Sequence, residues 1–160
     1  MAQTERGIAR VTGASSGIGL ATAVALSRVG YKVYGTSRKP TSSAAQGVTM
    51  LVCDVVDDAS VQALVDEVLK REGRIDLLVN NAGYAVSGAA EESSVEQVRA
   101  LFDTNFLGVV RVTNAVLPIM RAQGAGRILT TGSVMGLIPG PFGAYYSASK
   151  HAIEGYSESL

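Results

Sequence analysis

Short apolar runs alternate with longer helical patterns along this chain, and the alternation limits its fold more than any other feature. The candidate strands are residues 8–12, 31–36, 48–53, 75–79 and 127–131. The candidate helices are residues 20–29, 61–70, 94–122 and 144–160. Strands that alternate with helices are typical of βαβ units and a parallel sheet. The sequence has no internal repeat or linker, so it predicts one α/β domain over residues 1–160.

The composition is that of a globular chain and argues against several classes of function. Residues are 47% hydrophobic and 18% charged, which is unlike a disordered chain. Fourteen basic residues balance fourteen acidic ones without clusters, so neither nucleic acid nor an anionic membrane is indicated as a partner. Cys53 is the single cysteine, which excludes an internal disulfide and favours a reducing compartment. With no signal peptide or membrane span indicated, we expect a cytoplasmic protein, and we assign no metal site.

A glycine-rich turn follows the first candidate strand and opens the first candidate helix. Gly13, Gly17 and Gly19 give the spacing G-x-x-x-G-x-G. Small residues let the backbone approach a pyrophosphate, and the start of a helix offers free N–H groups and a favourable dipole. A glycine trio is often only a tight turn, but here the strand–turn–helix context favours nucleotide binding.

The end of the second candidate strand indicates which nucleotide is preferred. An NAD-binding chain would place an acid there for the ribose 2′-hydroxyl, but this chain has TSRK at residues 36–39. Arg38 can pair bidentately with a 2′-phosphate, with Lys39 or Ser37 in support. We therefore expect NADP(H) rather than NAD(H), the alternative being a pair of solvated loop cations. Asp54, at the end of the third strand, is placed either to meet the adenine or to cap the next helix.

The candidate catalytic residues lie between residues 133 and 150. Tyr146 and Lys150 are four residues apart and share one helix face, whereas Tyr145 points elsewhere. An ammonium beside a phenol lowers the phenol's pKa from its usual value of about 10, which is the direction that proton transfer near neutral pH needs. Ser133 comes from an earlier segment and could donate to a substrate oxygen. Taken alone, such a Tyr–Lys pair is more often a half-buried aromatic ring beside a solvated amine.

Several motifs together resemble the short-chain dehydrogenase/reductase family. They are TGASSGIG at residues 12–19, NNAG at 80–83, TNFLG at 104–108, Ser133, and YSASK at 146–150. The resemblance implies a Rossmann-like, doubly wound parallel sheet in three α/β/α layers. It also implies an NADP-preferring carbonyl reductase or alcohol dehydrogenase.

The resemblance also implies roles for individual residues. Tyr146 would be the catalytic acid/base, and Lys150 would lower its pKa and hold the nicotinamide ribose. Ser133 would polarise the substrate carbonyl. Asn105 would distort the long helix locally and hold a water that links Lys150 to solvent. The residues expected to bind the cofactor are Gly13, Ser15, Ser16, Gly17, Ile18, Gly19, Arg38, Asp54, Val55, Asn81, Ala82, Gly83, Tyr146 and Lys150.

The expected activity is NADP(H)-dependent interconversion of a ketone or aldehyde with an alcohol, on a small-molecule substrate. One alternative is a sugar-nucleotide epimerase or dehydratase of the extended branch, which the spacing of the glycine turn disfavours. Another is a non-catalytic nucleotide-binding fragment. Residue-level alternatives also stand: Asn80 and Asn81 could satisfy backbone groups at a strand end, and Asn105 could be a polar residue on an exposed helix face. His151 is interpreted as a surface or interface side chain. Residues 139–142 hint at an apolar substrate.

Two features depart from the family pattern. Family members continue beyond the helix that carries Tyr146, so we expect a C-terminally truncated form. It would lack the last strands of the family fold, expose the fifth strand as an edge and have impaired activity, whereas the full-length form would be a homo-oligomer. Arg10 lies in a central strand that should be apolar throughout. An unpaired guanidinium there would be costly, so Arg10 should either find a carboxylate or lie at an open strand end.

Overall fold

The computed structural model describes residues 6–40 and 47–160. Residues 1–5 and 41–46 lie outside these ranges. Within them, no helix combines the length and the apolar character needed to cross a membrane.

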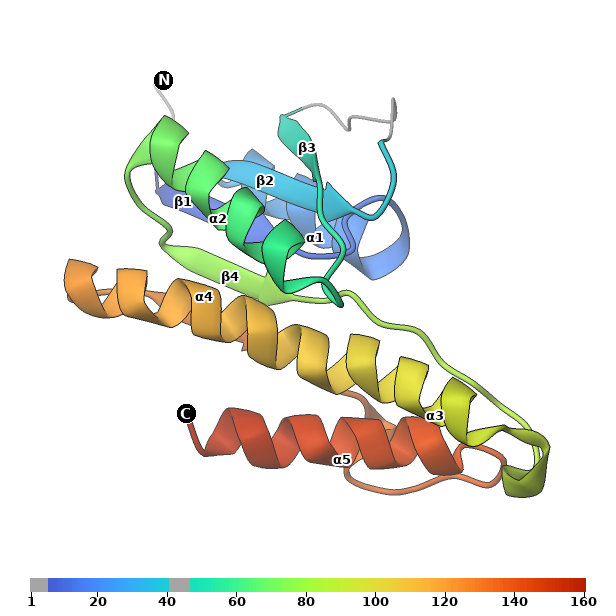
Figure 1. Cartoon of the computed structure of the whole chain (residues 1–160). Helices are drawn as coiled ribbons and strands as arrows, with labels where there is room; N and C mark the ends of the chain where they lie inside the picture. The colour runs from blue at the N-terminus through green and yellow to red at the C-terminus, as the bar shows by residue number, and fades with distance from the viewer. Residues whose placement is uncertain (1–5, 41–46) are drawn as a thin grey trace.

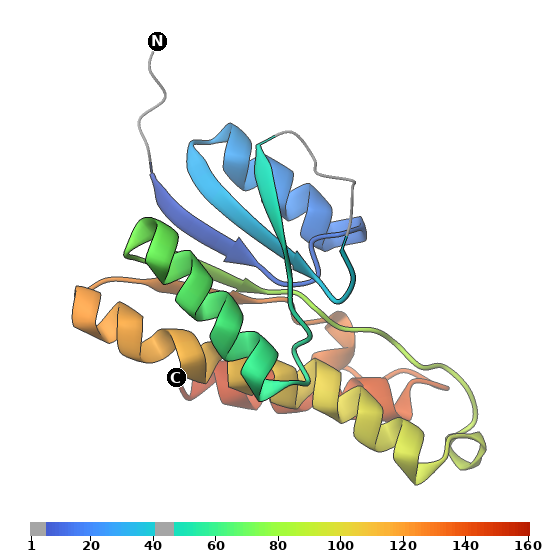
Figure 2. The ribbon, with the colours of Figure 1, turned by 45° about the horizontal axis from the view of Figure 1, so that its top comes forward.

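Five parallel strands form one sheet in the order β3-β2-β1-β4-β5 (Figure 1). Their bounds are β1 Gly7–Val11, β2 Tyr31–Ser37, β3 Val48–Val52, β4 Leu77–Asn80 and β5 Arg127–Thr130. The first strand is central, because Ala9 pairs with Val33 of β2 on one side and with Leu77 of β4 on the other. The direction of winding reverses between β1 and β4, and all five carboxyl ends lie at the same edge of the sheet (Figure 2). The predicted α/β fold with a parallel sheet is confirmed.

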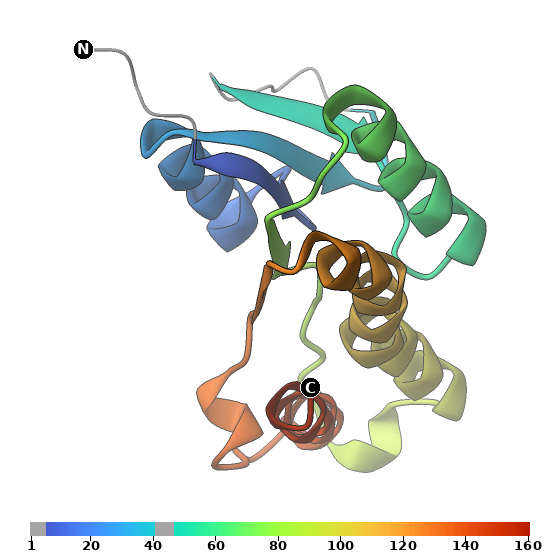
Figure 3. The same cartoon turned by 90° about the vertical axis from the view of Figure 1, so that its left-hand side faces the viewer.

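Helices cover both faces of the sheet. Their bounds are α1 Gly17–Arg28, α2 Asp58–Glu72, α3 Val95–Phe102, α4 Gly108–Gln123 and α5 Ala144–Glu158, with short turns η1 Ala90–Glu92, η2 Asp103–Leu107 and η3 Val134–Gly136. Helix α1 covers one face, while α2 and α4 cover the other (Figure 3). Helix α5 packs against η3, η2 and α3.

Alternate side chains of β1 enter two separate cores. Ala9 and Val11 belong to the core under α1, and Ile8 belongs to the core under α2 and α4. A strand that is covered on both faces reads as a continuous apolar run, which is why the sequence identified it.

A π-helical turn divides the helix predicted over residues 94–122. Ser94 caps the start of α3, because the Ser94 side chain accepts a hydrogen bond from the Gln97 N–H. The π-helical turn η2 then separates α3 from α4 and contains the buried Asn105, where the family resemblance places a distortion. Pro118 lies inside α4, and the helix continues to Gln123. Asp57 caps α2, because its carboxylate accepts a hydrogen bond from the Ala59 N–H.

The Asp76 carboxylate links the start of β1 to the start of β4. It accepts a hydrogen bond from the Ile8 N–H at 2.7 Å and from Arg74 Nε at 2.9 Å. The backbone of Asp76 also bonds to Ile8 and Arg127, so three strands meet at this residue. Burial opposes ionisation of the carboxyl, but these donors outweigh it and hold the pKa of Asp76 below its usual range.

Arg10 meets neither expectation made from the sequence. Its side chain is 0% exposed, and it lies on the face of β1 that carries Ile8, beneath α2 and α4. None of its three guanidinium nitrogens has a hydrogen-bond partner within the described ranges, and the polar group that it faces is the Cys53 thiol. Burial lowers the pKa of Arg10 to about 10. The central strand therefore carries an uncompensated cation in an apolar core.

Candidate active site

The glycine turn between β1 and α1 has the conformation and the space that close backbone approach requires. Gly13 and Gly17 have φ values of 66° and 56°, in the left-handed region that favours glycine. A Cβ on Gly19 would lie 2.3 Å from the Gly13 carbonyl oxygen, so this position admits no side chain. A Cβ on Gly17 would meet no atom within 4 Å, which leaves the turn open on that side. These features fit a phosphate group at the start of α1.

Thr12 and Asn81 join the ends of β1 and β4 at the point where the sheet reverses direction. The Thr12 hydroxyl accepts hydrogen bonds from the backbone N–H groups of Asn81 and Ala82, at 2.9 and 3.0 Å. The Asn81 side-chain amide donates to the carbonyls of Thr12 and Gly13, at 3.0 and 3.3 Å. Asn81 therefore does satisfy backbone groups at a strand end, and in doing so it fixes the glycine turn. A ligand in an open α/β sheet is expected at this reversal.

A cleft of about 590 Å³ lies at the carboxyl ends of the strands. It brings together most of the predicted site residues: Gly13, Ser15, Ser16, Gly17, Ile18, Gly19, Arg38, Val55, Asn81, Ala82, Gly83, Tyr146 and Lys150. Ser37, expected beside Arg38, also lines the cleft, whereas the sequence analysis did not anticipate the other lining residues, which are Thr36, Cys53, Tyr84, Ala85, Thr104 and Thr131.

Arg38 lies at the end of the cleft formed by β2 and the glycine turn. Its side chain is exposed, and it follows directly on Ser37, the last residue of β2. The Ser37 hydroxyl donates to the backbone carbonyl of Lys39, which closes a tight turn around Arg38. A guanidinium at this end of the cleft can reach a phosphate on the ribose of a bound dinucleotide.

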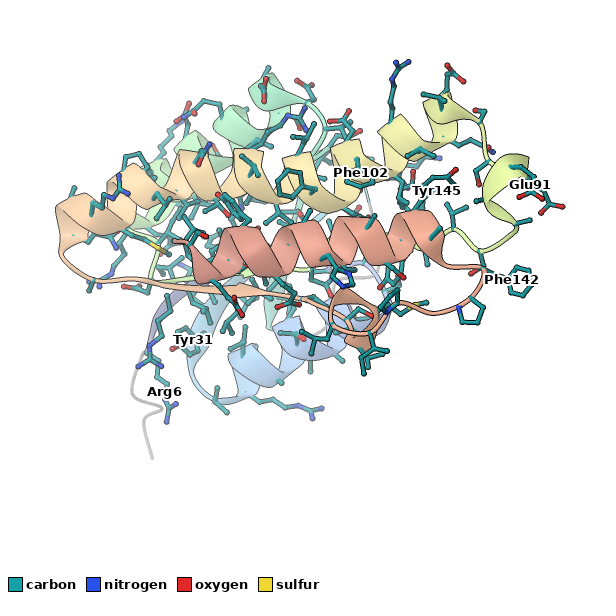
Figure 4. The ribbon with its side chains drawn as sticks, turned by 90° about the horizontal axis from the view of Figure 1, so that it is seen from below. Arg6, Tyr31, Glu91, Phe102, Phe142 and Tyr145 are labelled. Carbon is teal, nitrogen blue, oxygen red and sulfur yellow. The ribbon has the colours of Figure 1, made fainter. Side chains whose placement is uncertain are left out.

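Helix α5 carries Tyr146 and Lys150 at the opposite end of the cleft. The Lys150 ammonium lies 5.8 Å from the centroid of the Tyr146 ring and donates a 2.6 Å hydrogen bond to the Thr131 carbonyl. Burial lowers the pKa of Lys150, and the charge of Glu154 one turn further along α5 opposes that shift. The Tyr145 hydroxyl bonds instead to the Ala90 carbonyl, 2.9 Å away, so this tyrosine points elsewhere as predicted (Figure 4).

Three predicted residues, Asp54, Ser133 and Asn105, are not among the side chains that line the cleft in the described chain. The Asp54 carboxylate accepts from the Val56 N–H, a contact within its own loop, while Asp57 caps α2. The Ser133 hydroxyl caps η3 by accepting from the Met135 N–H at 3.2 Å.

Asn105 is buried behind the cleft. Its amide nitrogen donates to the Tyr84 carbonyl at 2.8 Å and to the Ser149 hydroxyl at 3.3 Å, and its oxygen accepts from the Tyr84 N–H. It therefore ties the π-helical turn to α5 and to the segment after β4. His151, which we interpreted as a surface side chain, is exposed and contacts the Ser147 carbonyl.

Fold and cleft together define a Rossmann-like α/β chain with a Tyr–Lys pair beside a dinucleotide-sized groove. The family model described as short chain dehydrogenase matches residues 7–160. The chain belongs to this family.

Curated relatives and solved structures agree with that assignment. The chain is 47% identical over 150 residues to 3-ketodihydrosphingosine reductase of Bacteroides thetaiotaomicron, covering 94% of this chain and 55% of that protein. A short-chain dehydrogenase/reductase from Burkholderia phymatum in complex with NAD superposes with a TM-score of 0.91 at 34% identity, covering 100% of this chain and 60% of the other. Actinorhodin polyketide ketoreductase, solved as a variant with NADPH, gives a TM-score of 0.88 at 36% identity, with coverages of 96% and 63%. The chain thus spans about half the length of the curated relatives it matches.

Proposed function

We propose that this chain provides the cofactor cleft and the catalytic side chains of an NADP(H)-dependent oxidoreductase that interconverts a ketone or aldehyde with an alcohol. The observation that carries the proposal is the joint placement of the glycine turn, Arg38, Tyr146 and Lys150 around one cleft. The family's named members are dehydrogenases and reductases, and its solved members include complexes with both nicotinamide dinucleotides.

The residues of the cleft fit such a cofactor. Gly13 and Gly17 would let the pyrophosphate reach the start of α1, and Asn81 would hold the turn in that shape. The bound nicotinamide would supply or accept a hydride at the substrate carbon. Arg38 would bind the 2′-phosphate, which is the basis for preferring NADP(H) to NAD(H).

Tyr146 would give a proton to the carbonyl oxygen in reduction and take it back in oxidation. Lys150, whose ammonium is held near the Tyr146 ring by the Thr131 carbonyl, would keep a positive charge beside the tyrosine that transfers the proton. Ser133 would donate its hydroxyl hydrogen to the developing oxyanion while its oxygen continues to accept from the Met135 N–H. Asn105 would hold the π-helical turn η2 and α5 in fixed positions relative to each other.

A titration with NADPH and NADH tests the cofactor assignment. We expect NADPH to bind the purified protein more tightly than NADH, and Arg38→Ala to weaken NADPH binding about tenfold or more while leaving NADH binding unchanged. Lys39→Ala is the matched control, because it removes the neighbouring cation that does not line the cleft. Equal affinity of the unmodified protein for the two cofactors would disprove the preference, and failure to bind either would disprove the proposal.

A further inference from the structure

Glu154 lies one helical turn beyond Lys150 on α5, and the two side chains reach neighbouring residues of the turn that follows β5. The Lys150 ammonium donates to the Thr131 carbonyl at 2.6 Å. The Glu154 carboxylate lies against the next residue, Gly132, because a Cβ added to this glycine would overlap Glu154 Oε1. Residues four apart on a helix share one face, so one face of α5 brings both charges to this turn.

Glycine at two positions leaves room for the Glu154 carboxylate. A Cβ on Gly136, inside η3, would lie 3.2 Å from Glu154 Oε1 and 3.0 Å from the Lys150 carbonyl oxygen. Helix α5 packs closely against η3 here (Figure 3). Neither Gly132 nor Gly136 has a positive φ, so the backbone conformation does not require glycine at either position. The space that the Glu154 side chain occupies does.

The Glu154 side chain reaches the turn from behind the cleft. It lines a separate cavity of about 650 Å³ between α4, β5 and α5, whereas Lys150 lines the cleft that would hold the cofactor. Glu154 is not among the residues that line that cleft in the described chain. Its carboxylate therefore touches neither the cofactor nor the substrate, and its influence on a reaction would pass through Lys150 and the turn.

Among the residues that the structure describes, Glu154 is the charge that acts on the Lys150 ammonium. Burial lowers the pKa of Lys150, and the negative charge of Glu154 opposes that shift. Residues 128–149 contain no charged side chain. The other charged or titratable groups around α5 lie in the cleft, are exposed or have a partner of their own: Tyr84 and Tyr146 in the cleft, Glu96 and Arg99 of α3, Asp103 of η2, Arg111 and Arg121 of α4, Arg127 of β5, and His151 and Glu158 of α5.

We propose that Glu154 is a positioning residue of the active site. Its carboxylate supplies the negative charge behind the Lys150 ammonium. By packing against Gly132, it also fixes the turn between Thr131 and Ser133. Both contacts act on groups that the proposed function places around the reacting oxygen, so the inference rests on that function.

Glu154→Gln tests the charge, because it keeps the size of the side chain. Removing a negative charge lowers the pKa of the ammonium that it faces, so Lys150 should lose its proton at a lower pH. We expect the Lys150 titration, followed by NMR of isotope-labelled lysine in the protein without cofactor, to move down by about 0.5–1 pH unit. The alkaline limb of kcat/KM for reduction of 4-nitrobenzaldehyde by NADPH should move in the same direction. Glu158→Gln, the same change at an exposed position of α5, is the matched control and should move neither.

Gly132→Ala tests the packing. The added Cβ would meet Glu154 and, apart from its chain neighbours, no other described residue within 4 Å, so it should push the carboxylate away from the turn. We expect kcat to fall about tenfold and the Lys150 titration to move down as in Glu154→Gln. In a Glu154→Ala background the overlap is absent, so adding Gly132→Ala should change kcat and the titration little.

Two results would overturn the inference. One is a Lys150 titration in Glu154→Gln that equals the titration in the unmodified protein. The other is an effect of Gly132→Ala that is equally large with and without the Glu154 side chain, since the glycine would then be needed for another reason. If the protein reduces no carbonyl, the proposed function fails separately, and the Lys150 titrations of these variants still decide the inference.

Discussion

Lys150 is fixed to the end of β5 by a 2.6 Å hydrogen bond from its ammonium to the Thr131 carbonyl. The bond sets how far the ammonium can travel and leaves it 5.8 Å from the centre of the Tyr146 ring. A backbone carbonyl cannot neutralise the lysine, so the positive charge stays available to the phenol. The strand end therefore fixes where the Lys150 ammonium lies relative to the Tyr146 ring.

Tyr146→Phe should remove turnover and spare cofactor binding. The substitution keeps the ring and removes only the hydroxyl that would transfer the proton, so we expect kcat to fall about 10²-fold or more. Tyr145→Phe is the matched control, because that hydroxyl bonds to Ala90 outside the cleft. Steady-state rates and NADPH titrations on both variants make the comparison, and wild-type turnover in Tyr146→Phe would eliminate this tyrosine as the acid/base.

Thr12→Val should weaken both the fold and the cofactor site. It removes the acceptor of two backbone N–H groups and leaves them unsatisfied, a loss of about 1–3 kcal/mol in the free energy of unfolding. Thr12→Ser retains the hydroxyl and should lose much less. Urea denaturation and NADPH titration of the two variants measure the effect. Equal stability of the two would mean that the hydroxyl does not hold the strand ends together.

Arg10→Leu should stabilise the protein. It replaces a buried, unpaired cation with an apolar side chain, and we expect a gain of about 1–3 kcal/mol, or about 2–4 °C in Tm for each kcal/mol. The exposed Arg121→Leu is the control and should change Tm little. A lower Tm for Arg10→Leu would show that the guanidinium makes a stabilising contact.

The difference in stability between Arg10→Leu and the wild-type protein should also depend on pH. The pKa of Arg10 is lowered to about 10 in the folded protein, below its value in the unfolded chain, so the unfolded state binds the proton more tightly. The folded protein therefore regains stability as pH rises above about 10. The advantage of Arg10→Leu over the wild type should shrink in that range, and a constant difference would contradict the assignment.

Asp76→Asn should remove part of the acid sensitivity of the fold. The pKa of Asp76 is lower in the folded protein than in the unfolded chain, so the ionised carboxylate stabilises the fold above the ordinary carboxyl pKa. This stabilisation is lost as pH falls through the pKa that Asp76 has in the folded protein. We expect the variant to be less stable than wild type by about 1–3 kcal/mol at pH 7, with the difference vanishing in acid. Asp66→Asn, on the exposed face of α2, is the control. Unfolding curves from pH 7 down to acid test this.

The sequence could identify the residues whose chemical type alone indicates their structural role. Apolar runs located the strands, and Gly13, Gly17 and Gly19 located the turn because only glycine fits there. The partners of these residues were harder to foresee. Thr131 acts through a backbone carbonyl, which every residue has, and Thr12 acts through a hydroxyl whose partners lie about 70 positions away. The π-helical turn was expected only from the family resemblance, because the helical pattern of residues 94–122 runs through it unbroken.

The central place of β1 in the sheet has a consequence for how the molecule assembles. Strand β1 cannot be fully paired until β4 exists, since the Ile8–Asp76 and Thr12–Asn81 contacts close loops of 68 and 69 positions. Closing such loops costs chain entropy before any contact compensates, so folding should be slow and its transition state non-local. The cleft is complete only once α5 docks and Lys150 reaches Thr131. A nascent chain that stops before that helix would hold its glycine turn without the groups that use it.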